Sequence, residues 1–112
     1  MIKAIARLLG ATSSGQIDAL SREVADLSVE GVCLLVGDQV ESMTFSEARG
    51  YVRARAAAIV GRHARLAMGR HPGADPASTD LVARTAVERL VPVVLRQTGV
   101  GVPKTVMARM AA

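Results

Sequence analysis

His63, His71 and Cys33 are the side chains of this 112-residue chain that could carry acid–base, nucleophilic or metal chemistry near neutral pH. His63 falls on the apolar face of an expected long helix, where an imidazole could act as a ligand or as a general base. No carboxylate can orient its ring from the same helix, because the positions three and four residues away are Ile59, Val60, Leu66 and Ala67. We therefore expect His63 to be a core residue.

Metal binding and paired-acid catalysis lack the residues that they need. A metal site takes several Cys, His, Asp or Glu ligands, and the chain has one cysteine and two histidines. His71 stands beside Pro72 in an expected loop and should be solvated, while Glu23 and Asp26 lie on a polar helix face and serve solubility. We expect no catalytic residue, no metal, no cofactor and no enzymatic activity. A site that uses His63, or one shared across a dimer, is the remaining enzymatic alternative.

Cys33 lies inside the apolar run 32–36. A single cysteine excludes a disulfide framework and predicts an inert, buried thiol in a cytoplasmic protein. No apolar run approaches the ~18 residues of a transmembrane helix, so no membrane span is expected. Arg7 interrupts the apolar segment 1–9, which argues against a secretion signal.

The charges are divided unequally along the chain. Residues 1–47 hold seven acids and three bases, a net charge of −4, whereas residues 48–112 hold eleven bases and three acids, a net charge of +8. A basic half suggests nucleic acid or another anionic surface. It is equally consistent with an acidic half that lies against the basic half, within one chain or between two copies. Twelve of the fourteen bases are arginine, which is typical of a GC-rich genome and weakens the case for phosphate binding.

Two segments are candidates for contact with nucleic acid. The first is a degenerate helix-turn-helix near 94–110, in which Gly99 would form the turn and Pro103 interrupts the motif. The second is an arginine stripe on the long helix, which lacks interleaved aromatic residues for base stacking. The candidate contacts are Arg55, Arg62, Arg65, Lys104 and Arg109.

Local signals set the boundaries of the expected helices. Ser13 with Gln16 and Thr44 with Glu47 have the spacing of capping boxes. The second box begins a long helix near 46–68, which ends at the glycine and proline residues of segment 69–73. The expected apolar face of that helix comprises Val52, Ala56, Ile59, Val60, His63, Leu66 and Ala67. Segment 32–36 is either part of a helix near 29–43 or a short buried strand; the lack of a partner strand favours the helix.

A helix near 79–98 has an unusually broad apolar face and contains Pro92, which predicts a kink. One packed side of a small domain needs an apolar stripe somewhat over 100° wide. The excess width suggests that a second copy covers part of it. The expected interface residues are Val87, Leu90, Val91 and Val94.

These observations together predict one all-α domain over residues 1–112, compact and built from four to six helices. The helix near 46–68 should pack on the kinked helix near 79–98, with short helices within 1–9 and after Pro103. The expected function is that of a non-enzymatic, self-associating interaction or regulatory module that docks a protein partner. The alternative is a nucleic-acid-binding regulator that uses the basic C-terminal half.

Overall fold

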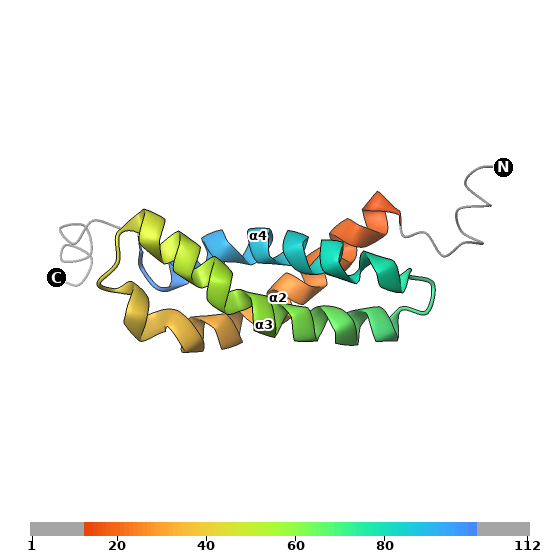
Figure 1. Ribbon diagram of the computed structural model, residues 1–112, viewed down its shortest axis with the longest axis horizontal. Helices are drawn as coiled ribbons and strands as arrows, with labels where there is room; N and C mark the ends of the chain where they lie inside the picture. Colours follow the sequence, from red (N-terminus) through yellow and green to blue (C-terminus); the bar gives the residue numbers. More distant parts are fainter. Residues whose placement is uncertain (1–12, 101–112) are drawn as a thin grey trace.

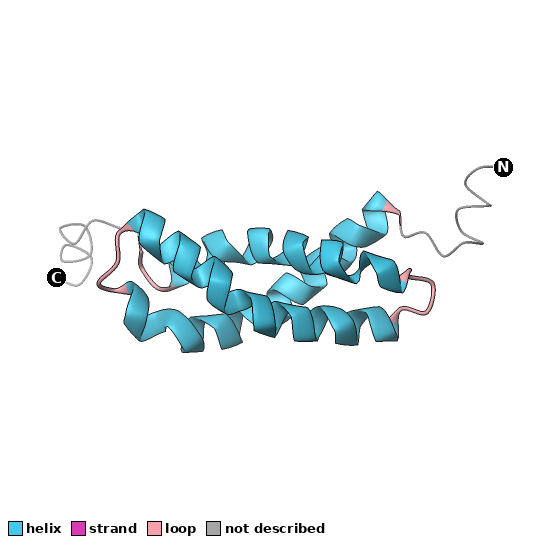
Figure 2. Ribbon diagram, in the orientation of Figure 1, coloured by secondary structure: helices cyan, strands magenta, loops and turns pink. Residues whose placement is uncertain are grey.

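The computed structural model describes residues 13–100, and within this range the chain forms three long α-helices and no strand. They are α2 (Ser14–Val40), α3 (Phe45–Arg70) and α4 (Thr79–Gln97), and a short 3-10 helix, η1 (Pro76–Ser78), leads into α4 (Figures 1 and 2). Each long helix packs against the other two. In Figure 1, α3 runs antiparallel to both neighbours, so that α2 and α4 point the same way.

The two predicted capping boxes are confirmed and explain where α2 and α3 begin. The amide of Gln16 donates to Ser13 Oγ (3.1 Å), and the Ser13 amide donates to Gln16 Oε1 (3.2 Å). In the second box the Glu47 amide donates to Thr44 Oγ1 (3.2 Å), and the Thr44 amide donates to Glu47 Oε1 (3.1 Å). Each box satisfies N–H groups that have no partner within the helix. The helices expected near 46–68 and 79–98 are present, at 45–70 and 79–97.

The predicted number of four to six helices is wrong for the described region. Residues 14–40 form one uninterrupted helix, which includes most of the segment expected as a separate helix near 29–43. The Ser28 hydroxyl donates to the Val24 carbonyl at 2.7 Å, so this polar side chain has a hydrogen-bond partner within the helix. The helical alternative for segment 32–36 is confirmed. The short helices expected within 1–9 and after Pro103 lie outside the described residues.

The core consists of a stripe on each helix in which buried positions recur every four residues. These positions are Leu20, Val24, Ser28, Val32, Val36 and Val40 in α2, Ala48, Val52, Ala56, Val60 and Ala64 in α3, and Val82, Ala86, Leu90 and Val94 in α4. Since the α-helix has 3.6 residues per turn, such a stripe drifts by about 40° per repeat and crosses the helix surface obliquely. Helices that interlock along these ridges cross at an angle, and Figure 1 shows α2 running obliquely across the bundle.

The core side chains are small. Most are Val and Ala, and Leu90 is the largest side chain that is completely buried. Ser21 and Ser28 are also fully buried, and both hydroxyls donate to the carbonyl four residues earlier in α2. Small side chains allow the helix backbones to approach closely. The van der Waals contacts of the core therefore come from closely spaced helices, and not from large aromatic side chains.

The end of α4 has a well-defined cap. Gly99 adopts a positive φ of 79°, and its amide donates to the Arg96 carbonyl while the Val100 amide donates to the Leu95 carbonyl. This pair of bonds is a Schellman motif, which brings the residue after the glycine back against the last turn. Pro92 lies inside α4 on its exposed side, and the helix continues through it to Gln97.

Candidate functional site

The four residues predicted to form an interface between copies are buried within a single chain. Val87, Leu90, Val91 and Val94 are 9, 0, 3 and 0% exposed, respectively. The face of α4 is broad because α4 packs on α2 and α3 at once. Its width therefore has an explanation inside the monomer, and a surface for any partner must be sought elsewhere.

Three of the six large apolar side chains that reach solvent in the described region belong to α2: Leu27, Leu34 and Leu35. Leu34 is 81% exposed, the highest value among the large hydrophobic residues of the described region, and Leu27 is 48% exposed. At 100° per residue, these two leucines and three acids fall within an arc of roughly 80° on α2. We call this surface the acidic leucine face: Leu27, Glu30, Leu34, Asp38 and Glu41.

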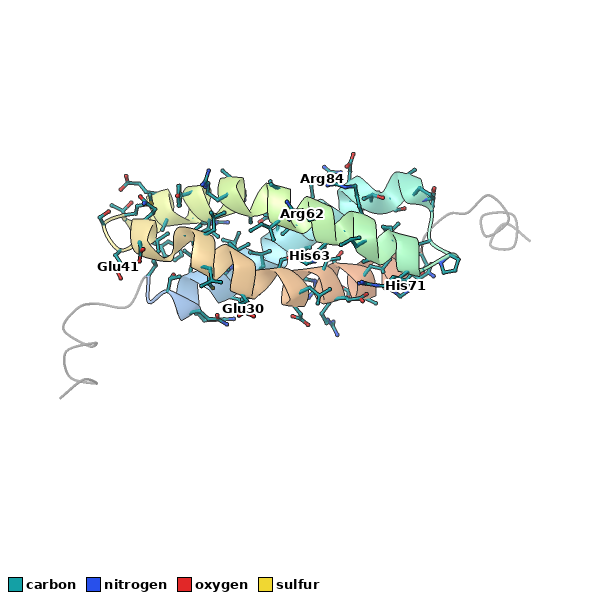
Figure 3. The ribbon with its side chains drawn as sticks, turned by 90° about the horizontal axis from the view of Figure 1, so that it is seen from below. Glu30, Glu41, Arg62, His63, His71 and Arg84 are labelled. Atoms are coloured by element: carbon teal, nitrogen blue, oxygen red, sulfur yellow. The ribbon has the colours of Figure 1, made fainter. Side chains whose placement is uncertain are left out.

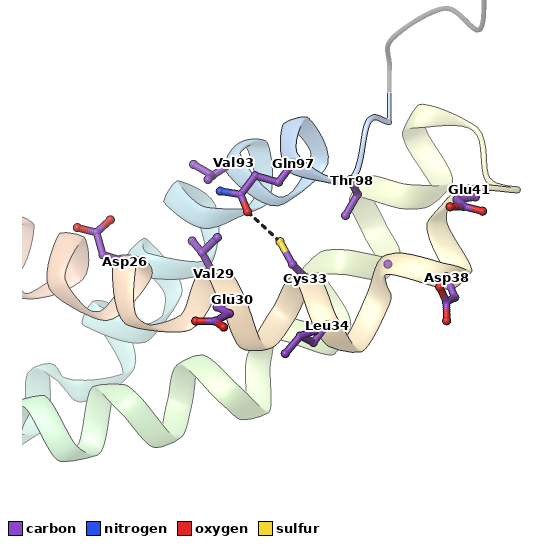
Figure 4. A pocket seen from close by; sticks show the side chains of 11 residues that line it. Asp26, Val29, Glu30, Cys33, Leu34, Asp38, Glu41, Val93, Gln97 and Thr98 are labelled. Atoms are coloured by element: carbon purple, nitrogen blue, oxygen red, sulfur yellow. Dashed lines mark hydrogen bonds between the residues drawn. The ribbon is translucent and has the colours of Figure 1, made fainter. Parts of the chain in front are cut away.

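An open groove of about 720 Å³ lies beside Leu34, between α2 and the last turns of α4, and shares Glu30, Leu34, Asp38 and Glu41 with this face (Figure 4). Asp26, Glu30, Asp38 and Glu41 contribute four carboxylates to its lining. The Cys33 thiol projects towards α4 in Figure 4 and lies 3.4 Å from Gln97 Oε1. Burial raises the pKa of the Cys33 thiol, which favours the protonated form near neutral pH.

The carboxylates of this groove differ from Asp18, Glu23 and Glu88, the acids of α2 and α4 that form ion pairs. Asp18 pairs with Arg22 and, across the bundle, with Arg89. Glu23 contacts Arg70 (3.4 Å) and His71 (3.3 Å) at the end of α3, and Glu88 holds Arg53.

No ion pair or side-chain hydrogen bond forms at the four groove carboxylates within residues 13–100, so their charges face solvent uncompensated. In Figure 3, Glu30 projects from α2 at one edge of the bundle, whereas Arg84 projects from α4 at the opposite edge.

The helix dipole makes two of these charges unfavourable. The C-terminal end of an α-helix carries a partial negative charge, which favours Lys or Arg in the last turn. The last turn of α2 has no basic residue. Asp38 lies in it instead, and Glu41 is the C-cap residue. Both carboxylates repel the end of the helix that carries them.

The predicted arginine stripe is exposed on α3. Arg55, Arg62 and Arg65 all reach solvent, and none forms an ion pair with another described residue. Arg55 lies over the ring of Tyr51, 5.9 Å from its centroid. Lys104 and Arg109 lie outside the described residues, as does most of the second half of the degenerate helix-turn-helix near 94–110.

His63 lies within α3, and His71 follows the last residue of that helix. His63 is half-buried on α3, and no group of three potential metal ligands occurs in the described part of the chain. His71, expected to be solvated, is exposed and contacts Glu23. Glu23, assigned to solubility from its position in the sequence, thus links the first turns of α2 to the end of α3.

The fold and surface together define an all-helical bundle whose acidic and basic faces lie on different helices. The chain matches no protein-family model, no curated protein and no solved structure at a significant level. Among residues 13–100, no helix is both long and apolar enough to cross a membrane.

The acidic leucine face was missed from the sequence although its signal is present there. Leu27 and Leu34 are seven residues apart, and Glu30, Asp38 and Glu41 share their side of a helix. The pattern becomes visible only when 14–40 is treated as one helix, because a separate helix near 29–43 contains Leu34 but not Leu27. Which side of α2 stays uncovered also depends on where α3 and α4 pack.

Proposed function

We propose that this protein is a non-enzymatic interaction module whose acidic leucine face binds a basic amphipathic helix of a protein partner. The observation that carries the proposal is Leu34, which is 81% exposed among four carboxylates that have no partner in the described region. Partner helices of this class insert apolar side chains at helical spacing into a groove, while their basic residues pair with acids at its rim.

The dimensions of the face suit such a partner. Leu27 to Glu41 spans about 21 Å along α2, the length of roughly four helical turns. The seven-residue spacing of Leu27 and Leu34 matches the repeat with which two packed helices meet. The open groove beside Leu34 is wide and shallow, which fits the side of a helix better than a small molecule.

The helix dipole adds a reason for the partner to be basic. Asp38 and Glu41 destabilise the end of α2 in the unbound chain, and a cation placed against them relieves this repulsion. Residues that are unfavourable for folding but favourable for binding are typical of functional surfaces. The same charges disfavour anionic partners at this groove.

The test uses a synthetic helix of Leu and Lys, about 16 residues long, labelled for fluorescence anisotropy. We expect saturable binding that weakens as salt rises, since exposed charges are screened. Leu34→Glu should weaken binding at least tenfold, because it removes a buried leucine from the complex. Leu66→Glu is the matched control: Leu66 is 55% exposed on α3, away from the groove, and its substitution should leave binding unchanged.

The control peptide has the same composition in scrambled order, so that it keeps its charge but loses its apolar stripe. Equal binding of both peptides, or an equal loss in the two leucine variants, would contradict a helix-specific site. A second copy of the chain is the competing occupant. Sedimentation equilibrium of the protein alone would favour that occupant if it showed a dimer that both Leu34→Glu and Arg62→Glu dissociate.

A nucleic-acid-binding regulator is the second candidate function, supported by the unpaired arginines of α3. Gel shifts with duplex DNA at several salt concentrations test it, because neutralising phosphates makes affinity fall steeply with salt. A combined Arg55→Gln, Arg62→Gln and Arg65→Gln variant should lose this binding but keep the peptide binding described above. Absence of a shift at low salt would eliminate this candidate.

A further inference from the structure

A second groove lies between the start of α3 and the end of α4, apart from the acidic leucine face. Its volume is about 340 Å³, near the lower end of the ~300–1,000 Å³ range of small-molecule sites. Five of its eight lining residues are apolar. The lining consists of Phe45, Arg49, Glu88, Val91, Pro92, Leu95, Arg96 and Val100.

Helix geometry places apolar groups and arginines on the same walls of this groove. Phe45 and Arg49 are one turn apart on α3, and Pro92 and Arg96 are one turn apart on α4. The Schellman motif after α4 turns Val100 back towards Leu95, and both residues line the groove. Phe45, the only phenylalanine of the chain, remains 53% exposed beside it.

The charges around the groove leave two cations without partners. Arg53 holds the Glu88 carboxylate by two hydrogen bonds, of 2.9 and 3.0 Å, so that this acid is already neutralised. Arg49 and Arg96 form no ion pair or side-chain hydrogen bond within the described residues. The apolar side chains of the groove can bind a hydrocarbon chain, and the two unpaired guanidinium groups beside it can bind an anionic head group.

We propose that this groove binds a small amphiphile with one linear apolar chain and one carboxylate, of the class of medium-chain fatty acids. The apolar chain would lie on Phe45, Leu95 and Val100, and the carboxylate would pair with Arg49 or Arg96. The basic helix proposed for the acidic leucine face is repelled here, because the unpaired charges have the opposite sign. A nucleotide finds few matching groups, since its base needs polar partners that the apolar floor lacks.

Isothermal titration calorimetry with octanoate, decanoate and dodecanoate, kept below their micelle concentrations, tests the proposal. Each added methylene group should tighten binding about fourfold, the change equivalent to about 0.8 kcal/mol per buried methylene. Decanol, which has the chain without the charge, should bind at least tenfold more weakly than decanoate. Equal affinities for decanol and decanoate would overturn the role of the arginines.

Variants locate the site. Arg96→Gln and Arg49→Gln should each weaken decanoate binding several-fold, whereas Arg65→Gln, an exposed arginine elsewhere on α3, should have no effect. Leu34→Glu should also have no effect, which separates this proposal from the partner-helix proposal. Decanoate-induced NMR shifts should centre on Phe45, Leu95 and Val100. Shifts centred on the groove beside Cys33, or equal weakening by Arg65→Gln, would show that the assignment is wrong.

Discussion

The Cys33 thiol is half-buried between α2 and α4, and its burial raises its pKa. We expect iodoacetamide to modify native Cys33 more slowly at pH 7.5 than it modifies the denatured chain, because the thiolate is the reactive form. Mass spectrometry of timed samples measures both rates, with protein in guanidinium chloride as the control. Equal rates in the native and denatured states would contradict a shielded thiol.

Glu47 offers a pH-dependent test of the α3 cap. Its carboxylate accepts the Thr44 backbone amide and also contacts the Thr44 side chain, and these hydrogen bonds lower the pKa of Glu47. A lowered pKa means that the ionised form contributes stability above the ordinary pKa. That contribution is lost as the pH falls from neutrality into acid, below the ordinary pKa and through the lowered one.

Glu47→Gln isolates this effect, because Gln16 already performs the same capping role for Ser13 without a charge. Urea unfolding of both proteins across this pH range should show the wild type more stable near neutrality, with the difference shrinking in acid. A difference that stays constant with pH would show that the ionised cap does not contribute.

At the scale of the helices, the end of α4 depends on one backbone conformation. Gly99 has a φ of 79°, a region that costs a residue with a side chain roughly 1–2 kcal/mol. Gly99→Ala should lower the free energy of unfolding by about 1 kcal/mol. Gly50→Ala is the opposing control: Gly50 lies inside α3 with no atom within 4 Å of an added Cβ. It should raise that free energy by up to about 1 kcal/mol.

Both changes are read from urea or thermal unfolding followed by far-UV circular dichroism. An equal effect of the two alanines would contradict the special role of the Gly99 turn. The proposed fatty-acid groove provides a second readout, because the turn at Gly99 positions Val100. Gly99→Ala should therefore also weaken decanoate binding, whereas Gly50→Ala should not.

The helices were predictable where local chemistry fixes their ends. The capping boxes at Ser13 and Thr44, and the glycine and proline residues after α3, act over a few residues and can be recognised in the sequence. The continuity of α2 could not be predicted in this way. It depends on packing against α3 and α4, which is a contribution from outside the local segment.

Burial was harder to predict than helix boundaries. Leu66 was expected on the buried face of α3 but is 55% exposed, while Ala64, which was not assigned to that face, is fully buried. A helical wheel ranks positions by hydrophobicity. The crossing geometry instead selects the small residues that lie where two backbones are closest. For the same reason, exposure of Leu34 and burial of Leu90 follow only from the placement of all three helices.

The core of the whole bundle should therefore reject larger side chains. Ala56 is fully buried in α3, whereas Ala57 next to it is exposed. Ala56→Leu should lower the free energy of unfolding by about 1–3 kcal/mol, because it forces the closely packed helices apart. Ala57→Leu should change it by less than about 0.5 kcal/mol. A neutral Ala56→Leu would indicate a core with spare volume.

The central position of α3 has a kinetic consequence. α3 lies between its two partners along the chain, and it packs on both. Short connections close the α2–α3 and α3–α4 hairpins, whereas contacts between α2 and α4 need a far longer loop to close. Both the α2–α3 hairpin and the α3–α4 hairpin contain α3. We therefore expect α3 to take part in any folding nucleus that forms with a small entropy cost of loop closure.

Ala57→Gly and Ala19→Gly place equivalent, exposed substitutions in α3 and α2. Each should destabilise the protein by about 1 kcal/mol. In stopped-flow circular dichroism, the change in α3 should mainly slow folding, while the change in α2 should mainly accelerate unfolding. Identical partitioning between the two rates would instead indicate that α2 and α3 always form together, with α4 docking last.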